Sequence, residues 1–501
     1  MHEFAPQITS SIDHIVESLR FFRPELALSI GFICTIFCTL FVDRIWQSSS
    51  LWSFLLTIAA AFYFNIGEEL STTSMFFDML TIDHFSQSVR GIVLISTLII
   101  GIYLQQFVKL QALDKRTGDI FSILIATTLG MHALALTTNW LLAFIAIEMV
   151  SIGSYVLVAY FAEKKSESEA AMKYVLFGSV CAAFMLYGIS LIYGFTGSLN
   201  FTSMEQMKGL IAAPTVMSTI ALLFVFVGIG FKLGFVPFHV WTPDVYEGAP
   251  TPITAFLSTV PKVAAVALFS RLILAWTASP FYFGEVTLHF LCFISVVTML
   301  IGNLVALRQQ NIKRMMAYSS IGHTGFLLLA VLSYVHSEPE VLLFYLAVYT
   351  LMNLAVFGFV MLLEHQTGST QLESYAGLGK RFPIVFACLT FVGISLVGLP
   401  PTAGFIGKLF VFSSIFDIYQ NLDQELYLYL LIVGVLTSVI SLFYYLKIPL
   451  YSFLRKSPDF VSTENVRIAS QPIYLLAILF TIILFVSGLF PALLLDVFRA
   501  H

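Results

Sequence analysis

The stretch VFVGIGFKLGFVPFHVWTPDVYEGAPTPITAF, residues 225–256, places Lys232 beside glycine and Pro237 inside an apolar run. A second stretch, VGISLVGLPPTAGFIGKLFVFSSIF at residues 392–416, repeats this arrangement around Lys408. Proline removes a backbone donor and glycine tolerates unusual turns, so both stretches are predicted to be interrupted helices. Interrupted helices at matching places in two halves of a membrane protein commonly surround a transport site.

The composition of the whole chain fits a bilayer. Of its 501 residues 58% are hydrophobic and only 11% are charged, whereas a soluble domain carries about 25% charged residues. Net charge is −4 and no basic run of nucleic-acid type occurs, so no nucleic-acid partner is expected. The five cysteines lie in apolar runs without the spacing of a metal or iron–sulfur site. We therefore expect an all-α polytopic protein whose main environment is the lipid bilayer.

About fourteen helices are predicted from apolar runs long enough to cross roughly 30 Å of hydrocarbon. The twelfth run is too long for one straight crossing, and Pro400 and Pro401 near its middle should break it. The predicted crossings are 25–43, 51–66, 86–106, 119–138, 140–162, 170–194, 217–238, 252–276, 287–306, 315–334, 341–363, 382–417, 427–449 and 472–496.

The distribution of basic residues predicts the orientation of the helices. Loops that follow odd-numbered helices hold fifteen of the 25 Lys and Arg residues, which assigns these loops to the cytoplasm. Six others, including Arg90 and Arg271, are assigned to the outer side, together with both termini. The remaining four fall within hydrophobic spans: Lys173, Lys232, Lys262 and Lys408.

Charged groups inside a membrane are costly and indicate a function or a partner. A lysine near the midplane costs about 2.5–3.5 kcal/mol, and Glu148 is the clearest carboxylate inside a span. A Glu and Lys pair that can separate is able to load and release a proton, but a static ion pair that fixes helix register would leave the same pattern. His132 and His323 also lie inside spans, where each is either a proton relay or a hydrogen-bonded packing residue. No metal-site spacing occurs, so no metal is expected.

The spacing of these residues suggests an internal repeat. Glu148 and Lys232 are 84 residues apart, and His323 and Lys408 are 85 apart. Helices 4–8 and 9–13 then form two five-helix units, the second inverted because five is odd, unless the spacing is coincidental. The predicted divisions are 1–118 (N-terminal segment and helices 1–3), 119–276 (first repeat), 287–449 (second repeat) and 450–501 (a loop and helix 14).

Four stretches, in order, resemble one known family. They are GFKLGFVPFHVWTPDVYEGAPTPITAFLSTVPK (230–262), NIKRMMAYSSIGHTGF (311–326), YLAVYTLMNLAVFGFV (345–360) and GLPPTAGFIGKLFVF (398–412). The chain resembles subunit N of the bacterial proton-pumping NADH:quinone oxidoreductase, respiratory complex I, an antiporter-like subunit related to mitochondrial subunit 2. The 24 residues before the first helix are a departure, and we expect them to pack on the outer surface.

The resemblance implies a fourteen-helix fold with two inverted repeats, broken helices 7 and 12, and a proton relay across the middle of the membrane. It implies that Glu148 pairs with Lys232, that Lys262 is central, and that Lys408 is terminal. The other implied relay residues are Lys173, near the start of helix six, and His323; accessory candidates are His132 and His239, and the helix breaks are at Pro237, Pro400 and Pro401.

The resemblance also implies the setting. The chain would be a translocase subunit of the bacterial cytoplasmic (inner) membrane with no redox chemistry and no cofactor of its own. NADH, FMN, iron–sulfur clusters and quinone would bind partner subunits, and its neighbours would be the antiporter-like M subunit and the small K, J and A subunits. Three alternatives stay open: a subunit of a cation/proton antiporter, a ferredoxin- or hydrogenase-linked relative, and a structural subunit without a proton path.

Overall fold

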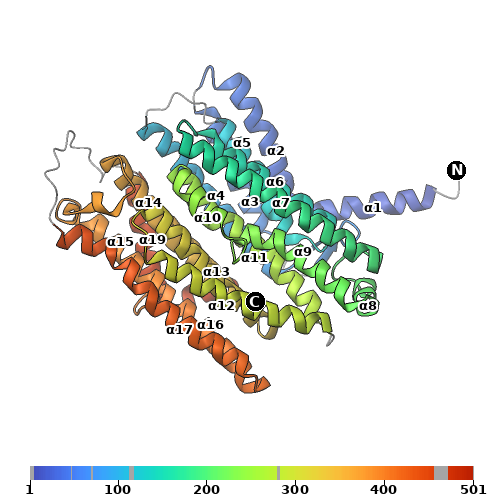
Figure 1. Ribbon diagram of the computed structural model, residues 1–501. Coiled ribbons are helices and arrows are strands. Elements are labelled where there is room, and N and C mark those ends of the chain that lie inside the picture. Colours follow the sequence, from blue (N-terminus) through green and yellow to red (C-terminus); the bar gives the residue numbers. More distant parts are fainter. Residues whose placement is uncertain are drawn as a thin grey trace.

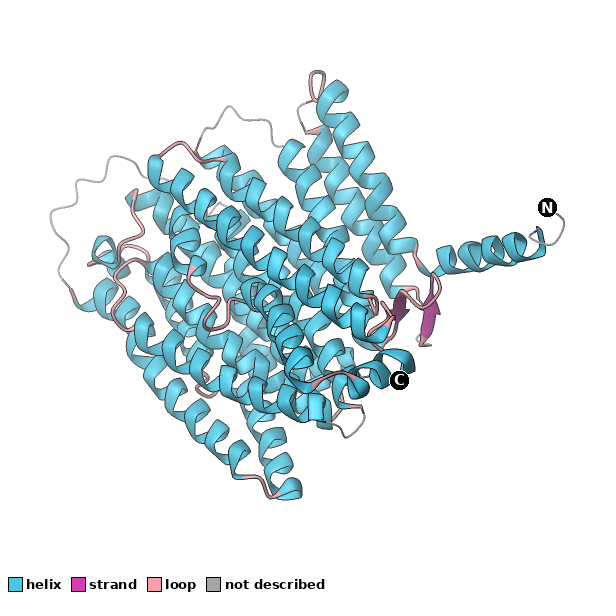
Figure 2. Ribbon diagram, turned by 45° about the vertical axis from the view of Figure 1, so that its right-hand side comes forward, coloured by secondary structure: helices cyan, strands magenta, loops and turns pink. Residues whose placement is uncertain are grey.

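The computed structural model describes residues 5–46, 48–68, 72–111, 118–278, 282–455 and 472–499. Helices of the described residues run side by side in one bundle (Figures 1 and 2). The first half contains α1 (Ala5–Phe21), α2 (Arg23–Phe37), α3 (Ser49–Ile66), β1 (Thr73–Met75), β2 (Leu80–Ile82), α4 (His84–Leu110), α5 (Gly118–Leu136), α6 (Trp140–Tyr160), α7 (Lys165–Thr196), α8 (Met204–Ala212), α9 (Thr215–Leu233) and α10 (Trp241–Gly248).

The second half continues with long helices and ends in the short helix α20. It contains α11 (Thr251–Thr277), α12 (Tyr282–Ala306), α13 (Ile312–His336), α14 (Glu340–Thr367), α15 (Pro383–Val397), α16 (Ala403–Leu422), α17 (Glu425–Tyr445), α18 (Lys447–Pro449), α19 (Pro472–Leu489) and α20 (Ala492–Phe498).

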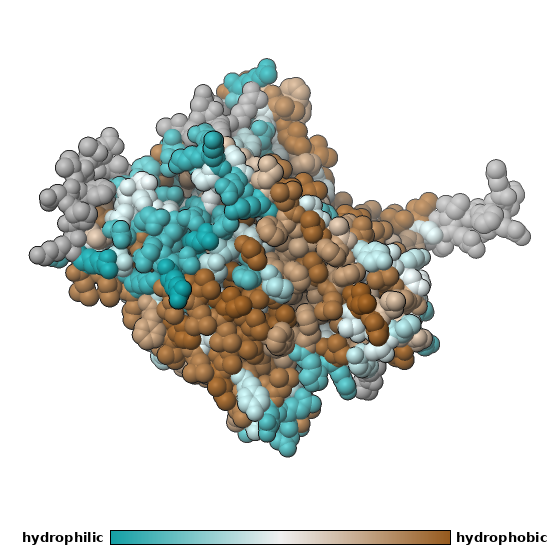
Figure 3. Space-filling model, viewed as in Figure 1, coloured by the Kyte–Doolittle hydropathy of each residue, from teal (hydrophilic) through white to brown (hydrophobic). Residues whose placement is uncertain are grey.

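The predicted crossings are confirmed. Within the described residues, thirteen helical segments are long and apolar enough to span a membrane, and α15 is a shorter apolar helix. Continued by α16, α15 forms the predicted twelfth crossing, so each of the fourteen predicted runs has a counterpart. Figure 3 shows the consequence on the surface, where an apolar band lies between two polar ends.

The two polar ends carry different elements. One end, here called the basic face, gathers Lys164, Lys173, Lys313 and Arg314 around a common cavity that six carboxylate side chains also line. The opposite end, here called the hairpin face, carries the antiparallel β1–β2 pair, and Arg271 binds Asp83 there across 2.7 Å. Four basic residues of the predicted cytoplasmic loops, Lys115, Arg116, Lys456 and Arg467, lie outside the described residues.

The N-terminal segment forms the helix α1, which projects from the bundle beside the two strands of the hairpin face (Figure 2). Its contacts involve its second half: Ser18 Oγ accepts a hydrogen bond from the Phe76 backbone at 3.0 Å, and the ring of His14 stacks on Phe77. The expectation that this segment packs on the surface therefore holds for the end nearest the bundle.

Both predicted helix breaks are present. α9 is followed by Gly234, whose φ of +71° is left-handed, and the chain passes Pro237 before α10 begins. α15 is followed by Gly398, with φ +86°, and Pro400 and Pro401 precede α16. A Cβ atom at Gly398 would stand 2.8 Å from Lys408 Cδ, so only glycine allows that side chain to lie against the break.

The innermost helices are α11, α13 and α14. The best apolar window of α11 is completely buried, and those of α13 and α14 are 94% buried, compared with 28% for the crossing that begins with α2. Polar side chains within these windows of α11 and α13 are therefore held inside protein and away from lipid.

Candidate functional site

Lys232, Lys262 and Lys408 are buried and come from three different helices. Lys232 stands in the last turn of α9, just before the break, and its Nζ donates to Ser151 Oγ on α6 at 3.2 Å. Glu148 lies three residues before Ser151 on α6, so both side chains occupy one face of that helix. Among the described residues no direct ion pair joins Glu148 to Lys232, and the lysine donates its hydrogen bond to the serine hydroxyl instead.

Lys262 is held by three oxygen acceptors on α13. Its Nζ donates to Ser320 Oγ at 2.7 Å, to Thr324 Oγ1 at 3.1 Å and to the Ser320 carbonyl at 3.2 Å. An ammonium group has three donors, so every one is used. Thr324 Oγ1 also lies 3.1 Å from the carbonyl of Leu233, the last residue of α9. A single threonine thus connects Lys262 with the residue that follows Lys232.

His323 continues this line of polar groups on α13. Its Nδ1 lies 2.9 Å from the Tyr345 hydroxyl on α14, and its ring lies beside Tyr349 with centroids 5.5 Å apart. Tyr349 in turn is hydrogen-bonded to Ser320 Oγ at 2.8 Å. On α13, His323 is flanked by the contacts of two lysines: Ser320 and Thr324 bind Lys262, and Lys408 lies over Phe326.

Lys408 lies beside the break between α15 and α16. Its Nζ donates to the carbonyls of Val397 at 2.8 Å and Leu396 at 3.1 Å, and to Ser438 Oγ at 3.3 Å. The same ammonium lies 4.4 Å from the centre of the Phe326 ring. The carbonyls at the end of α15 carry the negative end of the helix dipole, which stabilises the cation without a carboxylate.

Lys173 is not a buried lysine. Its side chain is 39% exposed at the basic face, where Nζ pairs with Asp244 and Glu169 at 2.8 Å each. The expectation of an intramembrane lysine is wrong here because α7 begins at Lys165, well before the apolar part of that helix. His239 lies in the break after α9 and is half-buried.

A polar cavity of about 630 Å³ opens at the basic face between the two predicted repeats. Asp244 on α10 sits at its wall and accepts from Lys173 at 2.8 Å and from Arg314 on α13 at 2.7 Å. Burial alone would raise the pKa of Asp244, but the hydrogen bonds from these two cations outweigh it and lower the pKa. The pairs join α7, α10 and α13 at the mouth of the cavity.

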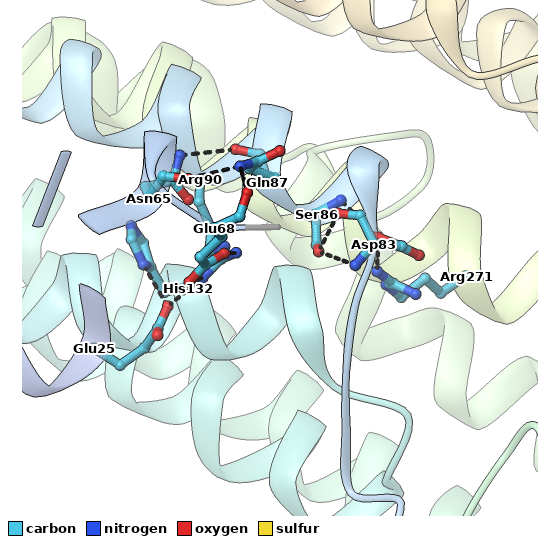
Figure 4. Close-up of polar contacts among 9 residues, drawn as sticks. All are labelled: Glu25, Asn65, Glu68, Asp83, Ser86, Gln87, Arg90, His132 and Arg271. Carbon is cyan, nitrogen blue, oxygen red and sulfur yellow. Dashed lines mark hydrogen bonds and ion pairs between the residues drawn. The ribbon is translucent and has the colours of Figure 1, made fainter. Parts of the chain in front are cut away.

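A second buried charged cluster was missed by the sequence interpretation (Figure 4). Arg90 on α4, placed near the outer surface by that interpretation, is completely buried and donates to Glu25 Oε1 at 3.1 Å and to Glu68. His132 Nδ1 lies 2.8 Å from the same Glu25 oxygen. Burial raises the pKa of Glu68 by more than Arg90 lowers it. The cluster joins α2, α4 and α5 near the hairpin face.

Comparisons with known proteins agree with the resemblance. Residues 137–441 match the family described as NADH:quinone oxidoreductase/Mrp antiporter, TM. NADH-quinone oxidoreductase subunit N 2 of Chloroherpeton thalassium is 37% identical over 490 residues, covering 96% of this chain and 94% of the relative.

Solved structures share the fold. A chain of respiratory complex I from Thermus thermophilus superimposes with a TM-score of 0.75 at 28% identity, covering 94% of this chain and 98% of that one. A chain of the Mrp complex from Dietzia sp. has a TM-score of 0.76 at 18% identity, covering 96% of each chain, and shows the fold alone.

Proposed function

The chain belongs to the NADH:quinone oxidoreductase/Mrp antiporter family, and we propose that it moves protons across the membrane as the N-type antiporter-like subunit of a complex I. It is a translocase subunit, and the buried lysines are the groups that would carry its function. The redox reaction would belong to partner subunits, which would bind NADH, FMN, iron–sulfur clusters and quinone.

One observation carries the relay proposal: Lys232, Lys262 and Lys408, three of the four buried lysines among the described residues, are each bonded to neutral oxygens. Lys232 uses a hydroxyl, Lys262 uses two hydroxyls and a carbonyl, and Lys408 uses two carbonyls and a hydroxyl. Among the described residues none of them forms a short ion pair with a carboxylate. A permanent counter-ion would hold the proton on the lysine, whereas neutral acceptors solvate the ammonium and still allow the proton to leave.

The order of the groups gives the proposed path. A change in the charge around Glu148 alters the electrostatic potential at Lys232. The helix of Lys232 ends at Leu233, whose carbonyl accepts a hydrogen bond from Thr324. A proton then moves between Lys262 and Lys408, bridged by His323 or water, since α13 carries His323 together with Ser320, which binds Lys262, and Phe326, which Lys408 overlies. The direction, from Glu148 toward Lys408, is part of the proposal.

The contacts also support the proposed inverted repeat. Lys232 contacts Ser151 in the first unit, and Lys408 lies over Phe326 in the second. The two lysines are 176 positions apart in the sequence and their two partners are 175 apart, so each lysine meets an equivalent position of its own unit. Lys262 likewise corresponds to Ser438, 176 positions later, which contacts Lys408. Lys232 lies before the helix break of the first unit, whereas Lys408 lies after the helix break of the second unit. The two units therefore keep the position of the lysine but differ in the position of the break.

The setting follows from the same proposal. The protein is a multi-pass membrane protein; we place it in the bacterial cytoplasmic membrane with the basic face inward and both termini outward. Its neighbours would be an M-type antiporter-like subunit and the small K, J and A subunits.

The test is Lys262→Ala in the assembled complex, with Lys208→Ala on the exposed surface of α8 as the matched control. Quinone reduction and proton uptake would be measured in the same membrane vesicles, after checking that the complex assembles. A relay requires that Lys262→Ala lose pumping and slow coupled quinone reduction by about 100-fold, the usual range for a lost proton-transfer group. An unchanged proton yield in both variants would leave Lys262 with a structural role.

A further inference from the structure

A cavity of about 590 Å³ lies away from the lysines, between α3, α4, α14 and α20. Most of its lining is apolar and includes Ile95 and Ile99 on α4 and Leu354 on α14. Small residues facing this space leave it open: a Cβ atom built on Gly91 would meet only Asn65 Nδ2, at 3.6 Å. The Leu354 carbonyl at the deep end is already satisfied by the Tyr103 hydroxyl at 2.9 Å, so this end offers apolar contact.

The mouth of the cavity is polar and lies at the hairpin face. His84, the first residue of α4, and Arg499, just after α20, supply its basic side chains. Arg499 is 52% exposed and paired with Asp496 at 3.2 Å and Glu340 at 3.5 Å, and Asp496 and Glu68 also line the mouth, so basic and acidic side chains stand side by side there. The guanidinium still has N–H groups that can donate to a phosphate oxygen. The cavity therefore has a charged opening and an apolar interior.

The dimensions match half of a bilayer. From His84 to Ile99 the cavity follows α4 for fifteen residues, or about 22 Å at 1.5 Å per residue. One leaflet contributes about 15 Å of hydrocarbon, half of the 30 Å core, with a polar head-group region above it. A whole helix about 10 Å wide and 22 Å long would need roughly 1,700 Å³, so the space suits a narrower occupant.

We propose that this cavity binds one phospholipid from the leaflet on the hairpin face. An acyl chain lies along α4 between Ile95 and Leu354, and the phosphate meets Arg499 and His84 at the mouth. The phosphate is favoured because a guanidinium binds its oxygens through charge-assisted hydrogen bonds, which an uncharged lipid cannot match.

The bound lipid would have two structural consequences. It would fill the gap between α4, in the N-terminal group of helices, and α14, in the second predicted repeat. It would also cover Asn65, Glu68 and Gln87, which line the mouth and hold one another through hydrogen bonds (Figure 4). Since Glu68 binds Arg90, the head group would separate the buried charged cluster from water at the hairpin face.

The test is photo-crosslinking in the purified, assembled complex. p-Benzoylphenylalanine replaces Ile95, which is 45% exposed and lines the cavity; in the control it replaces Ile152, which is 57% exposed on α6 and lies outside it. Irradiation follows exchange into lipid-free detergent, which removes loosely bound lipid, and mass spectrometry of the chain identifies each adduct.

The expected result is a phospholipid adduct at Ile95 in about tenfold excess over Ile152. In the Ile95 probe background, Gly91→Leu, which fills the cavity, and Arg499→Gln, which removes the phosphate partner, should each lower the adduct about tenfold. Arg455→Gln, at a residue outside the cavity that lies over Tyr451, should leave it unchanged. No excess at Ile95, an adduct with an isoprenoid quinone, or an adduct with a neighbouring protein chain would each overturn the proposal.

Discussion

Replacing Arg90 with glutamine should destabilise the chain more than any substitution of an exposed arginine. Arg90 is completely buried and neutralises two carboxylates, Glu25 and Glu68, so its removal leaves uncompensated charge inside the bundle. Breaking a buried ion pair from one side costs about 3–5 kcal/mol. Arg499→Gln removes a half-exposed pair and should cost about 0–1 kcal/mol.

The assay is unfolding of the tagged chain by sodium dodecyl sulfate, followed by protease sensitivity. A double variant, Arg90→Gln with Glu25→Gln, makes the test specific because it removes charge from both sides of the pair. It should be more stable than Arg90→Gln alone, with a coupling of about 1–3 kcal/mol. Equal unfolding midpoints for Arg90→Gln and Arg499→Gln, or strictly additive losses in the double variant, would refute this account of the cluster.

Three further predictions address the relay, the basic face and helix packing. Lys408→Arg keeps a cation against the α15 carbonyls, but arginine does not release its proton, so pumping measured in vesicles should fall about 100-fold; near-normal pumping would mean that a fixed charge suffices. The lowered pKa of Asp244 means that its ionised form stabilises the fold above the unfolded-state pKa, and that this contribution is lost as pH falls through the folded-state pKa. Thermal midpoints of wild type and Asp244→Asn should therefore differ near pH 7 and begin to converge only as the pH falls below about 4, toward the lowered folded-state pKa; a difference independent of pH would contradict the assignment. A Cβ atom at Gly302 would stand 2.3 Å from the Gly322 backbone nitrogen, so Gly302→Ala should force α12 and α13 apart and cost about 1–3 kcal/mol in the detergent assay, whereas an unchanged midpoint would argue against this close approach.

The crossings and both helix breaks could be predicted because they depend on local sequence. Apolar runs have the length of a bilayer, and the Gly and Pro residues around Lys232 and Lys408 interrupt helices wherever they occur. Burial of Lys262 was predictable for the same reason, since α11 is apolar on all sides. What local sequence cannot supply is the identity of the groups that meet these side chains, such as Ser320 and Thr324 on a helix 58–62 positions away.

The cluster around Arg90 was missed for a related reason. Arg90 is near the start of α4, and a charge at the start of a membrane-spanning run is predicted to lie at the membrane surface. Its partner Glu25 is 65 positions away on α2, and His132 lies 107 positions from Glu25, so no spacing rule connects them.

Lys173 shows the opposite error: the helix that carries it extends beyond the apolar segment, and the ammonium reaches Asp244 at the cavity of the basic face.

Thr324 connects the two halves of the proposed relay in a way that depends on the proton at Lys262. Its hydroxyl accepts from Lys262 and has one hydrogen to donate, with the carbonyls of Leu233 at 3.1 Å and Ser320 at 3.0 Å as acceptors. A deprotonated Lys262 becomes an acceptor itself and competes for that hydrogen, which weakens the bond to Leu233 at the end of α9. Since Lys232 is the residue before Leu233, a proton leaving Lys262 changes the helix end that positions Lys232. One hydroxyl can therefore make the charge states of the two lysines interdependent.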